Sequence, residues 1–445
     1  MIKITREGGE QLVKFSRKLE IEFSQEDKYI LDGQSKICNW LYNHLLEMVN
    51  NQYEKTGESL AENKYELRNQ VPCLKSDYPF LTTVYSSPTK NTAFRLYNAF
   101  QKFFAGENDH PKFRSWKKKW FSLYYDEPGK GYKLLDDRTL KIALGADKNN
   151  KRMYVYGKLQ ESLNLRDKDQ IKTFRLCKQQ GDRFYAIFTV ERIPVEKEID
   201  KEKWIAIDPN HKNFFVAVDY QGDTYTFEKL EILKYWDQVI DRIKSKRDLC
   251  QRKATLVTEN KGKNYYLPSR RWSRLNDALN RAYNRRREQT KSACFSIANF
   301  IAREYDHVAI GDYTPSLDTA IYDRMHRSML NQEIIGKFRK ILEWIMIRSG
   351  KSCSIVEETN TTKECCICGD LKKKSPDIRS FVCQECKTAL DRDINSAVNI
   401  AKKDTLLSGS DYEDWDLSQT SYTVRWDYQS STISFTGCDT EKSVA

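Results

Sequence analysis

The chain has 445 residues, of which 39% are apolar, and no apolar run is long enough to span a bilayer, which favours a globular protein of several domains. Lys and Arg outnumber Asp and Glu by 75 to 63, while residues 405–445 hold seven acids and two bases. The first 404 residues therefore carry a net charge of +17, which favours a polyanionic partner, most simply nucleic acid.

The first half of the chain predicts strands interrupted by helices. Residues 1–30 open with alternating apolar and polar residues, which indicates a strand. Over residues 31–108 apolar positions recur every three or four residues, and this unit ends near Gly106, a typical helix C-cap. Residues 109–200 return to aromatic and β-branched runs separated by turns. We therefore expect a helical unit inserted into a small β-rich domain.

The second half has a different pattern. Two buried strands, WIAID and VAIGD, frame long basic helices, and a further strand, SCSIVEE, precedes a cysteine cluster. A helix, DINSAVNIAKK, follows the cysteines. Alternating strands and helices predict an α/β fold with a partly parallel sheet. Residues 405–445 are rich in Ser, Thr and acids, so we predict that they are disordered and dispensable for activity.

Five of the twelve cysteines form a cluster, ECCICG…VCQECK, with two CxxC pairs separated by fourteen residues. Such pairs place four thiolates around a structural zinc ion, which leaves no open position for water. Scattered core thiols are the alternative, and the spacing argues against them. Cys366 would form a CxC pair, which fits zinc-ribbon geometry less well. The predicted ligands are Cys365, Cys368, Cys383 and Cys386.

Two aspartates stand at the ends of regular elements. Asp208 ends the strand WIAID, and Asp393 stands just before the helix that follows the cysteines. A carboxylate at a strand end costs solvation free energy unless it faces water, a partner or a metal. Each also has an ordinary explanation, Asp208 as a turn residue before Pro209 and Asp393 as a helix N-cap. Taken singly, each aspartate leaves both interpretations open.

The order of these motifs resembles the TnpB family of transposon-encoded RNA-guided nucleases, which is related to Fanzor proteins and type V CRISPR effectors. The resemblance is strongest over residues 201–403, from the strand that ends on Asp208 to DRDINSAVNI. It implies an α/β fold, a RuvC-like RNase H-type nuclease with an inserted zinc ribbon, plus a β-barrel wedge domain with a helical recognition insert. The implied domains are wedge 1–30 and 109–200, recognition 31–108, nuclease 201–360 and 388–404, zinc ribbon 361–387, and the acidic tail 405–445.

The resemblance also implies the nuclease site. Asp208 would be its first carboxylate and Asp393 its last, with Arg392 and Asn395 as companions of Asp393. Such a site holds two magnesium ions through hard oxygen ligands. One small departure is Asn210, which stands where the family usually has a glycine.

A larger departure concerns the third carboxylate. Most family members end the second strand on Glu-Asp, whereas this chain ends it on Gly311 and Asp312. Asp312 is one substitute, although alternation along a strand would aim it away from the metals. Glu358, on the neighbouring strand as in Fanzor-like members, fits the family spacing best, and Glu357 would face the opposite way. The remaining interpretation is a dead site. We expect that Glu358 is the third catalytic carboxylate.

Basic runs with interleaved aromatics occur at RSWKKKWF and SRRWSR, and NRRREQTK is also strongly basic. A solvated charged face is the alternative for any one run. Together they favour a nucleic-acid groove in which Arg and Lys contact phosphates. The candidate contacts are Lys117, Lys118, Arg270, Arg271 and Arg285.

The resemblance implies a noncoding guide RNA and target double-stranded DNA as partners, and magnesium-dependent cleavage next to a short flanking motif. A nuclease-dead RNA-guided repressor and a transposition accessory are the alternatives. No signal-peptide pattern opens the chain, so we expect a reducing compartment and no membrane partner. That compartment would be the cytoplasm, near the nucleoid, in a bacterium and the nucleus in a eukaryote.

Overall fold

The computed structural model divides the chain into two compact units, Met1–Ile193 and Pro194–Ala445. Within the described residues, no helix combines the length and apolar character that crossing a membrane requires. The structure describes residues 4–7, 10–115, 121–147, 149–179, 183–193, 202–210, 212–251, 254–258, 264–313, 334–372, 379–407, 420–430, 432–437 and 442–444.

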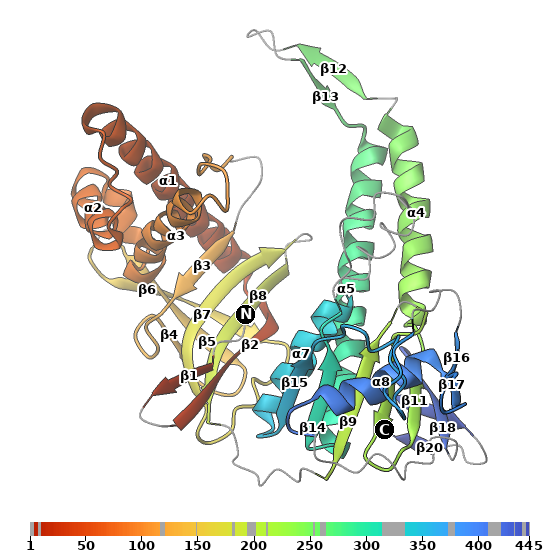
Figure 1. The fold of residues 1–445 in the computed structure, drawn as a ribbon. Coiled ribbons are helices and arrows are strands. Elements are labelled where there is room, and N and C mark those ends of the chain that lie inside the picture. The colour runs from red at the N-terminus through yellow and green to blue at the C-terminus, as the bar shows by residue number, and fades with distance from the viewer. Residues whose placement is uncertain are drawn as a thin grey trace. The chain divides into compact units, whose positions relative to one another are not determined.

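The first unit is built on one antiparallel sheet of eight strands (Figure 1). Its order is β3-β7-β8-β2-β6-β5-β4, and β1 pairs with β2. Burial alternates along β8, whose Phe184 and Phe188 are buried, and Phe188 packs against Phe174 of β7. The strands are β1 (Ile4–Glu7), β2 (Glu10–Glu22), β3 (Ser122–Tyr125), β4 (Tyr132–Leu134), β5 (Thr139–Ala146), β6 (Arg152–Leu159), β7 (Gln170–Gln179) and β8 (Arg183–Arg192).

A helical insert separates β2 from β3 and has its own hydrophobic core. Its first helix begins after Ser24, whose side chain caps the Asp27 N–H at 3.0 Å, and ends at Gly57, which adopts the left-handed φ of 75°. The insert therefore starts a few residues earlier than the boundary at 31 that periodicity indicated. Its elements are α1 (Gln25–Thr56), α2 (Lys64–Asp77), the 3-10 helix η1 (Pro79–Thr83) and α3 (Ser86–Phe104).

The second unit contains a mixed sheet in the order β15-β14-β9-β10-β11-β18-β19-β20. Strands β9, β10 and β11 form antiparallel hairpins, whereas β14 lies parallel to both β9 and β15. The strands are β9 (Trp204–Pro209), β10 (Phe215–Asp219), β11 (Thr224–Phe227), β14 (His307–Gly311), β15 (Ser352–Val356), β18 (Ser421–Trp426), β19 (Ile433–Gly437) and β20 (Lys442–Val444).

Helices cover both faces of this sheet, so its central strands are apolar on both sides. In β9, Ile205 and Ile207 join the core formed with helices α5 (Arg270–Glu304) and α7 (Ile334–Arg348). The alternate residues Trp204 and Ala206 pack instead under α8 (Arg392–Lys403). Because side chains alternate along a strand, the next even-numbered residue, Asp208, lies on the α8 face.

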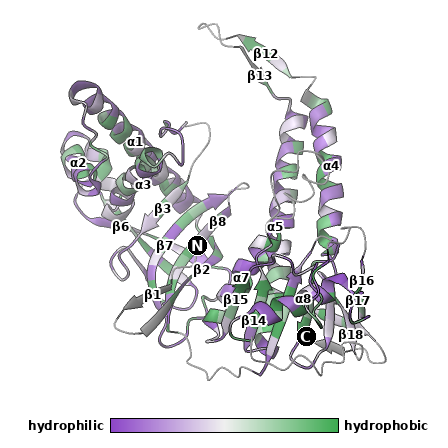
Figure 2. Ribbon diagram, viewed as in Figure 1, coloured by the Kyte–Doolittle hydropathy of each residue, from purple (hydrophilic) through white to green (hydrophobic). Residues whose placement is uncertain are grey.

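Two long helices connect β11 to β14. Helix α4 (Glu231–Gln251) runs alongside α5, and the short ribbon of β12 (Thr255–Thr258) and β13 (Asn264–Leu267) stands at their far end (Figure 1). Figure 2 shows long hydrophilic stretches on these two helices, in contrast with the hydrophobic central strands. The helices pack on the sheet only at the end near β11 and β14, so much of their length remains exposed to solvent.

The acidic tail was predicted to be disordered, but three of its described segments form strands. Its residues 421–426, 433–437 and 442–444 form β18, β19 and β20, and β18 pairs in parallel with β11. The apolar side chains of β18 and β19 complete the core on the α5 side of the sheet. The sequence contained a signal for these strands. The apolar residues Val424 and Trp426 alternate with polar ones, as do Ile433 and Phe435. The prediction of disorder relied on the composition of the tail and did not use this alternation.

Candidate functional site

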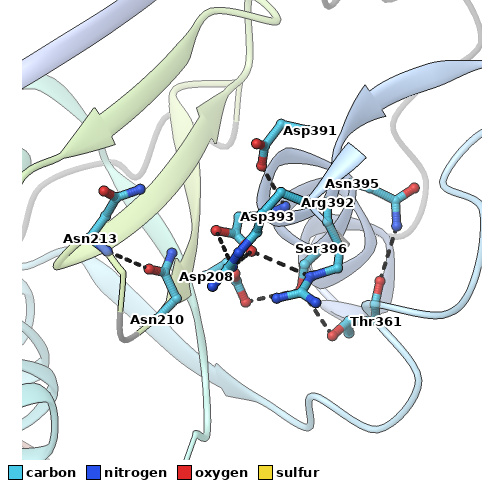
Figure 3. Close-up of polar contacts among 10 residues, drawn as sticks. Asp208, Asn210, Asn213, Thr361, Asp391, Arg392, Asp393, Asn395 and Ser396 are labelled. Carbon is cyan, nitrogen blue, oxygen red and sulfur yellow. Dashed lines mark hydrogen bonds and ion pairs between the residues drawn. The ribbon is translucent and has the colours of Figure 1, made fainter. Parts of the chain in front are cut away.

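Asp208 lies at the end of β9, only 5% exposed, and faces the first turns of α8 (Figure 3). Ser396 of α8 donates its hydroxyl to Asp208 Oδ1 at 2.9 Å. The Ser396 hydroxyl also lies 3.0 Å from that of Thr361, which donates to the backbone carbonyl of Glu358. Short hydroxyl bridges thus connect the end of β9 to the segment after β15.

Asp393 lies in the first turn of α8 and is 4% exposed. The N-cap is its neighbour Asp391, which accepts from the Asp393 N–H at 2.7 Å, so capping does not explain the Asp393 side chain. Arg379 Nη1 lies 3.1 and 3.2 Å from the two Asp393 carboxylate oxygens, and Arg392 Nε lies 3.7 Å from one of them. Arg379, which the sequence had not indicated, therefore orients Asp393.

Glu358 follows β15 and approaches the end of β14. Its Oε1 accepts from the Tyr313 N–H at 3.2 Å. A Cβ added to Gly311 would lie 1.9 Å from the same Oε1 atom, far closer than two non-bonded atoms can approach. The carboxylate of Glu358 therefore occupies the place where a side chain at position 311 would begin. That Glu358 takes over as a metal-binding carboxylate on the neighbouring strand stays a prediction.

The other two carboxylates that the sequence offered point elsewhere. Asp312 is exposed, and its Oδ1 accepts from the Glu358 backbone N–H at 3.2 Å. Glu357 is also exposed and accepts from the Thr359 hydroxyl. Alternation explains both orientations, because Gly311 and Val356 are paired neighbours and the residues that follow each of them face away from α8.

Burial raises the pKa values of all three carboxyl groups. Burial, together with the charges of Glu358 and Asp393, raises the pKa of Asp208 well above its usual value. Burial raises the pKa of Glu358 to about 7, an effect to which the Asp312 carboxylate adds. Burial also raises the pKa of Asp393, against the opposing charge of Arg379. Shielded anions that repel one another and offer only oxygen atoms fit the ligand chemistry of magnesium.

The four predicted zinc ligands form a compact group. The Sγ atoms of Cys365 and Cys386 are 3.6 Å apart, those of Cys368 and Cys383 are 3.5 Å apart, and all four lie within 4.8 Å of one another. Such a set of thiols fits tetrahedral zinc. Among the described residues no other group of three or more such side chains is as close, so the three carboxylates are more widely spaced than the thiols.

Cys366 is not part of the thiol group. Its backbone N–H donates to Asn395 Oδ1 at 2.9 Å, and its side chain is buried in the core under α8. The side-chain amides of Asn395 and Asn399 each donate to the carbonyls of Thr361 and Glu364. These bonds fix the start of the thiol cluster against the helix that carries Asp393. Asn395 had been expected beside Asp393, whereas the role of Asn399 was missed.

Around the first aspartate, Asn210 closes a local turn. Its Oδ1 accepts from the Asn213 backbone N–H at 2.8 Å (Figure 3). The side chain thus organises the connection between β9 and β10 where the family usually has a glycine. Asn210 therefore stabilises the turn that follows Asp208.

Three of the five predicted nucleic-acid contacts lie on α5. Arg270, Arg271 and Arg285 are all exposed, and helical spacing places the exposed Arg274 and Arg281 on one face with Arg270 and Arg285. Lys117 and Lys118 lie outside the described residues. The ring centroid of Trp272, the aromatic residue of SRRWSR, lies 5.7 Å from the guanidinium of Arg247.

Comparisons with known proteins fit this geometry. A family model described as "Cas12f1-like, TNB domain" matches residues 336–400, which contain the thiol cluster, Glu358 and Asp393. Two TnpB-like proteins of Acanthamoeba polyphaga mimivirus are each 25% identical to the chain, over 56% and 52% of its length. These matches cover 46% and 43% of the relatives, so the chain spans less than half of their length.

Among solved structures, that of a Cas12f1–sgRNA–target DNA complex is similar, with a TM-score of 0.59 at 14% identity, covering 85% of this chain and 83% of that one. The second unit therefore has the α/β fold of RuvC-type nucleases, with a cluster of four cysteines inserted before α8. These matches support the resemblance to the TnpB family that the order of the motifs indicated.

Proposed function

We propose that this chain is an RNA-guided endonuclease that cuts double-stranded DNA next to a short flanking motif, with a locus-encoded noncoding RNA as guide. The observation that carries the proposal is the position of Glu358, whose carboxylate lies where a side chain of Gly311 would begin, on the same face of the sheet as Asp208. A partly shielded carboxylate at this place costs solvation free energy, which a bound cation would offset.

In this proposal Asp208, Glu358 and Asp393 hold two magnesium ions. When bound, magnesium supplies an activated water and neutralises charge on the leaving oxygen of the phosphodiester. The Ser396 hydroxyl fixes one oxygen of Asp208, and Arg379 fixes the orientation of Asp393. Asp208 and Asp393 are buried and Glu358 is half-buried, so the protein shields the three carboxylates from bulk water. A bound substrate would exclude further water from the phosphate.

The remaining features support nucleic-acid binding. The arginines along one face of α5 can neutralise consecutive phosphates, as a channel for a guide–target heteroduplex requires, while base pairing supplies the sequence. A zinc ion held by the four thiols would be structural, since four protein ligands leave no position for a substrate. With these partners, the protein would act where DNA is found, at the nucleoid of a bacterium or in the nucleus of a eukaryote.

The test is magnesium-dependent cleavage of a plasmid that carries a guide-matched target beside a randomised flank, using protein purified with its locus RNA. Glu358→Gln and Asp393→Asn should abolish cutting and keep guide-dependent DNA binding, because each removes one charged ligand without changing side-chain size. Glu357→Gln is the matched control and should cut like the wild type. Binding without cutting by the wild type would instead identify a guided repressor, and the absence of a discrete bound RNA would favour a transposition accessory.

A further inference from the structure

We propose that residues 311–313 at the end of β14, together with Arg339 of α7, form a socket that positions the carboxylate of Glu358. The inference rests on the proposed function and assigns roles to three residues that hold no metal in it. In this view the end of β14 supports the carboxylate of Glu358, and Asp312, Tyr313 and Arg339 are positioning residues.

The first element of the socket is space. The Gly311 Cα is so close to Glu358 that an added Cβ would lie 1.9 Å from Oε1 and 2.7 Å from Cδ. Glycine is thus required by the neighbouring side chain and not by a turn, because Gly311 still lies within a regular strand paired with Val356. Any side chain at 311 would displace the carboxylate of Glu358.

The second element is a pair of reciprocal hydrogen bonds. The Tyr313 N–H donates to Glu358 Oε1 at 3.2 Å, while the Glu358 N–H donates to Asp312 Oδ1 at 3.2 Å. One bond fixes the carboxylate and the other fixes its backbone. The Asp312 N–H also donates to the Val356 carbonyl at 2.9 Å, so the β14–β15 pairing continues into the socket. Two consecutive residues, Asp312 and Tyr313, therefore hold the backbone and the side chain of Glu358.

The third element is Arg339, which holds the socket from the side of α7. Its Nη1 donates to the Gly311 carbonyl at 3.2 Å and to the Tyr313 carbonyl at 3.4 Å. These two carbonyls flank Asp312, so a single guanidinium fixes the segment that carries both hydrogen bonds to Glu358. The positive charge also attracts the carboxylate of Glu358 and opposes the effect of burial on its pKa. Arg339 therefore acts on Glu358 through backbone geometry and charge.

The socket makes a sharp prediction for Asp312, which is also the residue that a one-position shift of the usual glutamate would choose as a metal ligand. If Asp312 supports the Glu358 backbone, it needs an acceptor oxygen and no charge, so asparagine should replace it and alanine should not. If Asp312 is a ligand, its charge matters, and asparagine should be about as harmful as Glu358→Gln.

The experiment measures Mn²⁺ binding to the guide-loaded protein by electron paramagnetic resonance, and DNA cleavage over a range of Mn²⁺ concentrations. We expect Asp312→Asn to keep the wild-type affinity within about twofold, and Asp312→Ala to weaken it by about tenfold. Arg339→Ala should behave like Asp312→Ala, with the cleavage rate restored at saturating Mn²⁺, and Arg339→Lys, which keeps one donor, should recover part of the affinity. An Asp312→Asn protein as weak as Glu358→Gln, or wild-type affinity in both alanine variants, would overturn the proposal.

A second set of variants tests whether a carboxylate at position 311 can take the place of the Glu358 carboxylate. Glu358→Ala should lose Mn²⁺ affinity, and adding Gly311→Asp or Gly311→Glu to it should restore part of that affinity, because a carboxylate then grows from the adjacent strand into the vacated place. Gly311→Ala alone should weaken binding by displacing Glu358. Zinc content and circular dichroism confirm that each variant is folded. Double variants that are folded and bind no better than Glu358→Ala would refute the shared position.

The two proposals fail in different ways. Wild-type protein that binds Mn²⁺ and responds to the socket variants as expected, yet cuts no guided target, would refute the nuclease function and keep the socket. Guided cutting that requires Glu358 but ignores Asp312, Arg339 and Gly311 would refute the socket and keep the nuclease function.

Discussion

The two candidate metal centres of the second unit are assembled in opposite ways. The four thiols come from one short segment, residues 365–386, and their spacing can be read directly. The three carboxylates come from the ends of β9 and β15 and the start of α8, spread over residues 208–393. A site that is local in sequence is specified by its own spacing, whereas a distributed site depends on the register and faces of a whole sheet.

The two centres are nevertheless joined. Asn395 and Asn399 of α8 bind the carbonyl of Glu364, next to the first zinc ligand, while Ser396 of the same helix binds Asp208. One helix thus touches the thiol cluster with one set of side chains and the carboxylate centre with another. Substitutions in the thiol cluster should therefore show whether it supports the carboxylate centre.

The largest effect is expected from Cys383→Ser. Losing one thiolate should release zinc, and without zinc the segment between β15 and α8 has too small a core to stay folded. We expect zinc content to fall from one ion per chain to near zero and guided cleavage to fall by about a hundredfold or more. Metal analysis and plasmid cleavage measure the two losses.

The matched control is Cys366→Ala, because Cys366 neighbours a ligand and is buried outside the thiol group. It should keep its zinc and most of its cleavage activity. Zinc loss in this variant would show that Cys366 is a ligand in place of Cys365. Full cleavage by zinc-free Cys383→Ser would show that the two centres are independent.

The next largest effect concerns a region that the sequence misjudged. Trp426 is 8% exposed and packs in the core on the α5 side of the sheet. We expect Trp426→Ala to lower the free energy of unfolding by about 3 kcal/mol through the cavity that it leaves. The exposed Tyr428, just beyond β18, is the control, and Tyr428→Ala should change stability by less than about 0.5 kcal/mol. Intact cleavage after removal of residues 405–445 would bear out the prediction that the tail is dispensable for activity.

These cases show how much the sequence could provide. The strands of the central sheet are uniformly apolar, so WIAID and VAIGD were identifiable, and each aspartate could be placed at an element end. Family spacing then selected Glu358, but only the pairing of Gly311 with Val356 shows why Glu357 points away. Ser396, Arg379 and Arg339 were missed, because a side chain that supports a shielded carboxylate from a distant segment leaves no local pattern.

A smaller effect, on Mg²⁺ affinity, is expected when the hydroxyl of Ser396 is removed. Ser396→Ala removes the hydrogen bond to buried Asp208, so we expect about tenfold weaker Mg²⁺ affinity, visible as a shift in the concentration for half-maximal cleavage. The rate at saturating Mg²⁺ should change little. Thr359→Ala removes a similar hydroxyl–carboxylate bond on the exposed side, to Glu357, and should leave the Mg²⁺ dependence unchanged. Equal shifts in both variants would contradict a specific role for Ser396.

The smallest effect tests how the far end of α8 is held. Asp404, the C-cap, is buried and accepts from His307 Nε2 of β14 at 2.8 Å. Although burial alone would raise it, the hydrogen bonds from His307 and the Leu406 N–H hold the pKa of Asp404 below its usual value. A lowered pKa in the folded state means that ionised Asp404 stabilises the fold above a pH of about 4, and that this contribution is lost as the pH falls further.

We therefore expect Asp404→Asn to lower the free energy of unfolding by about 1 kcal/mol at pH 7, with the difference from the wild type shrinking below about pH 4. Thermal unfolding across this pH range measures it, with Asp109→Asn, an exposed aspartate paired with Lys112, as the control that should show no such change. Because α8 carries Asp393 at its other end, a weaker anchor at Asp404 should also raise the Mg²⁺ requirement slightly. If stability falls and the Mg²⁺ requirement stays constant, Ser396, Asn395 and Asn399 alone fix the start of α8.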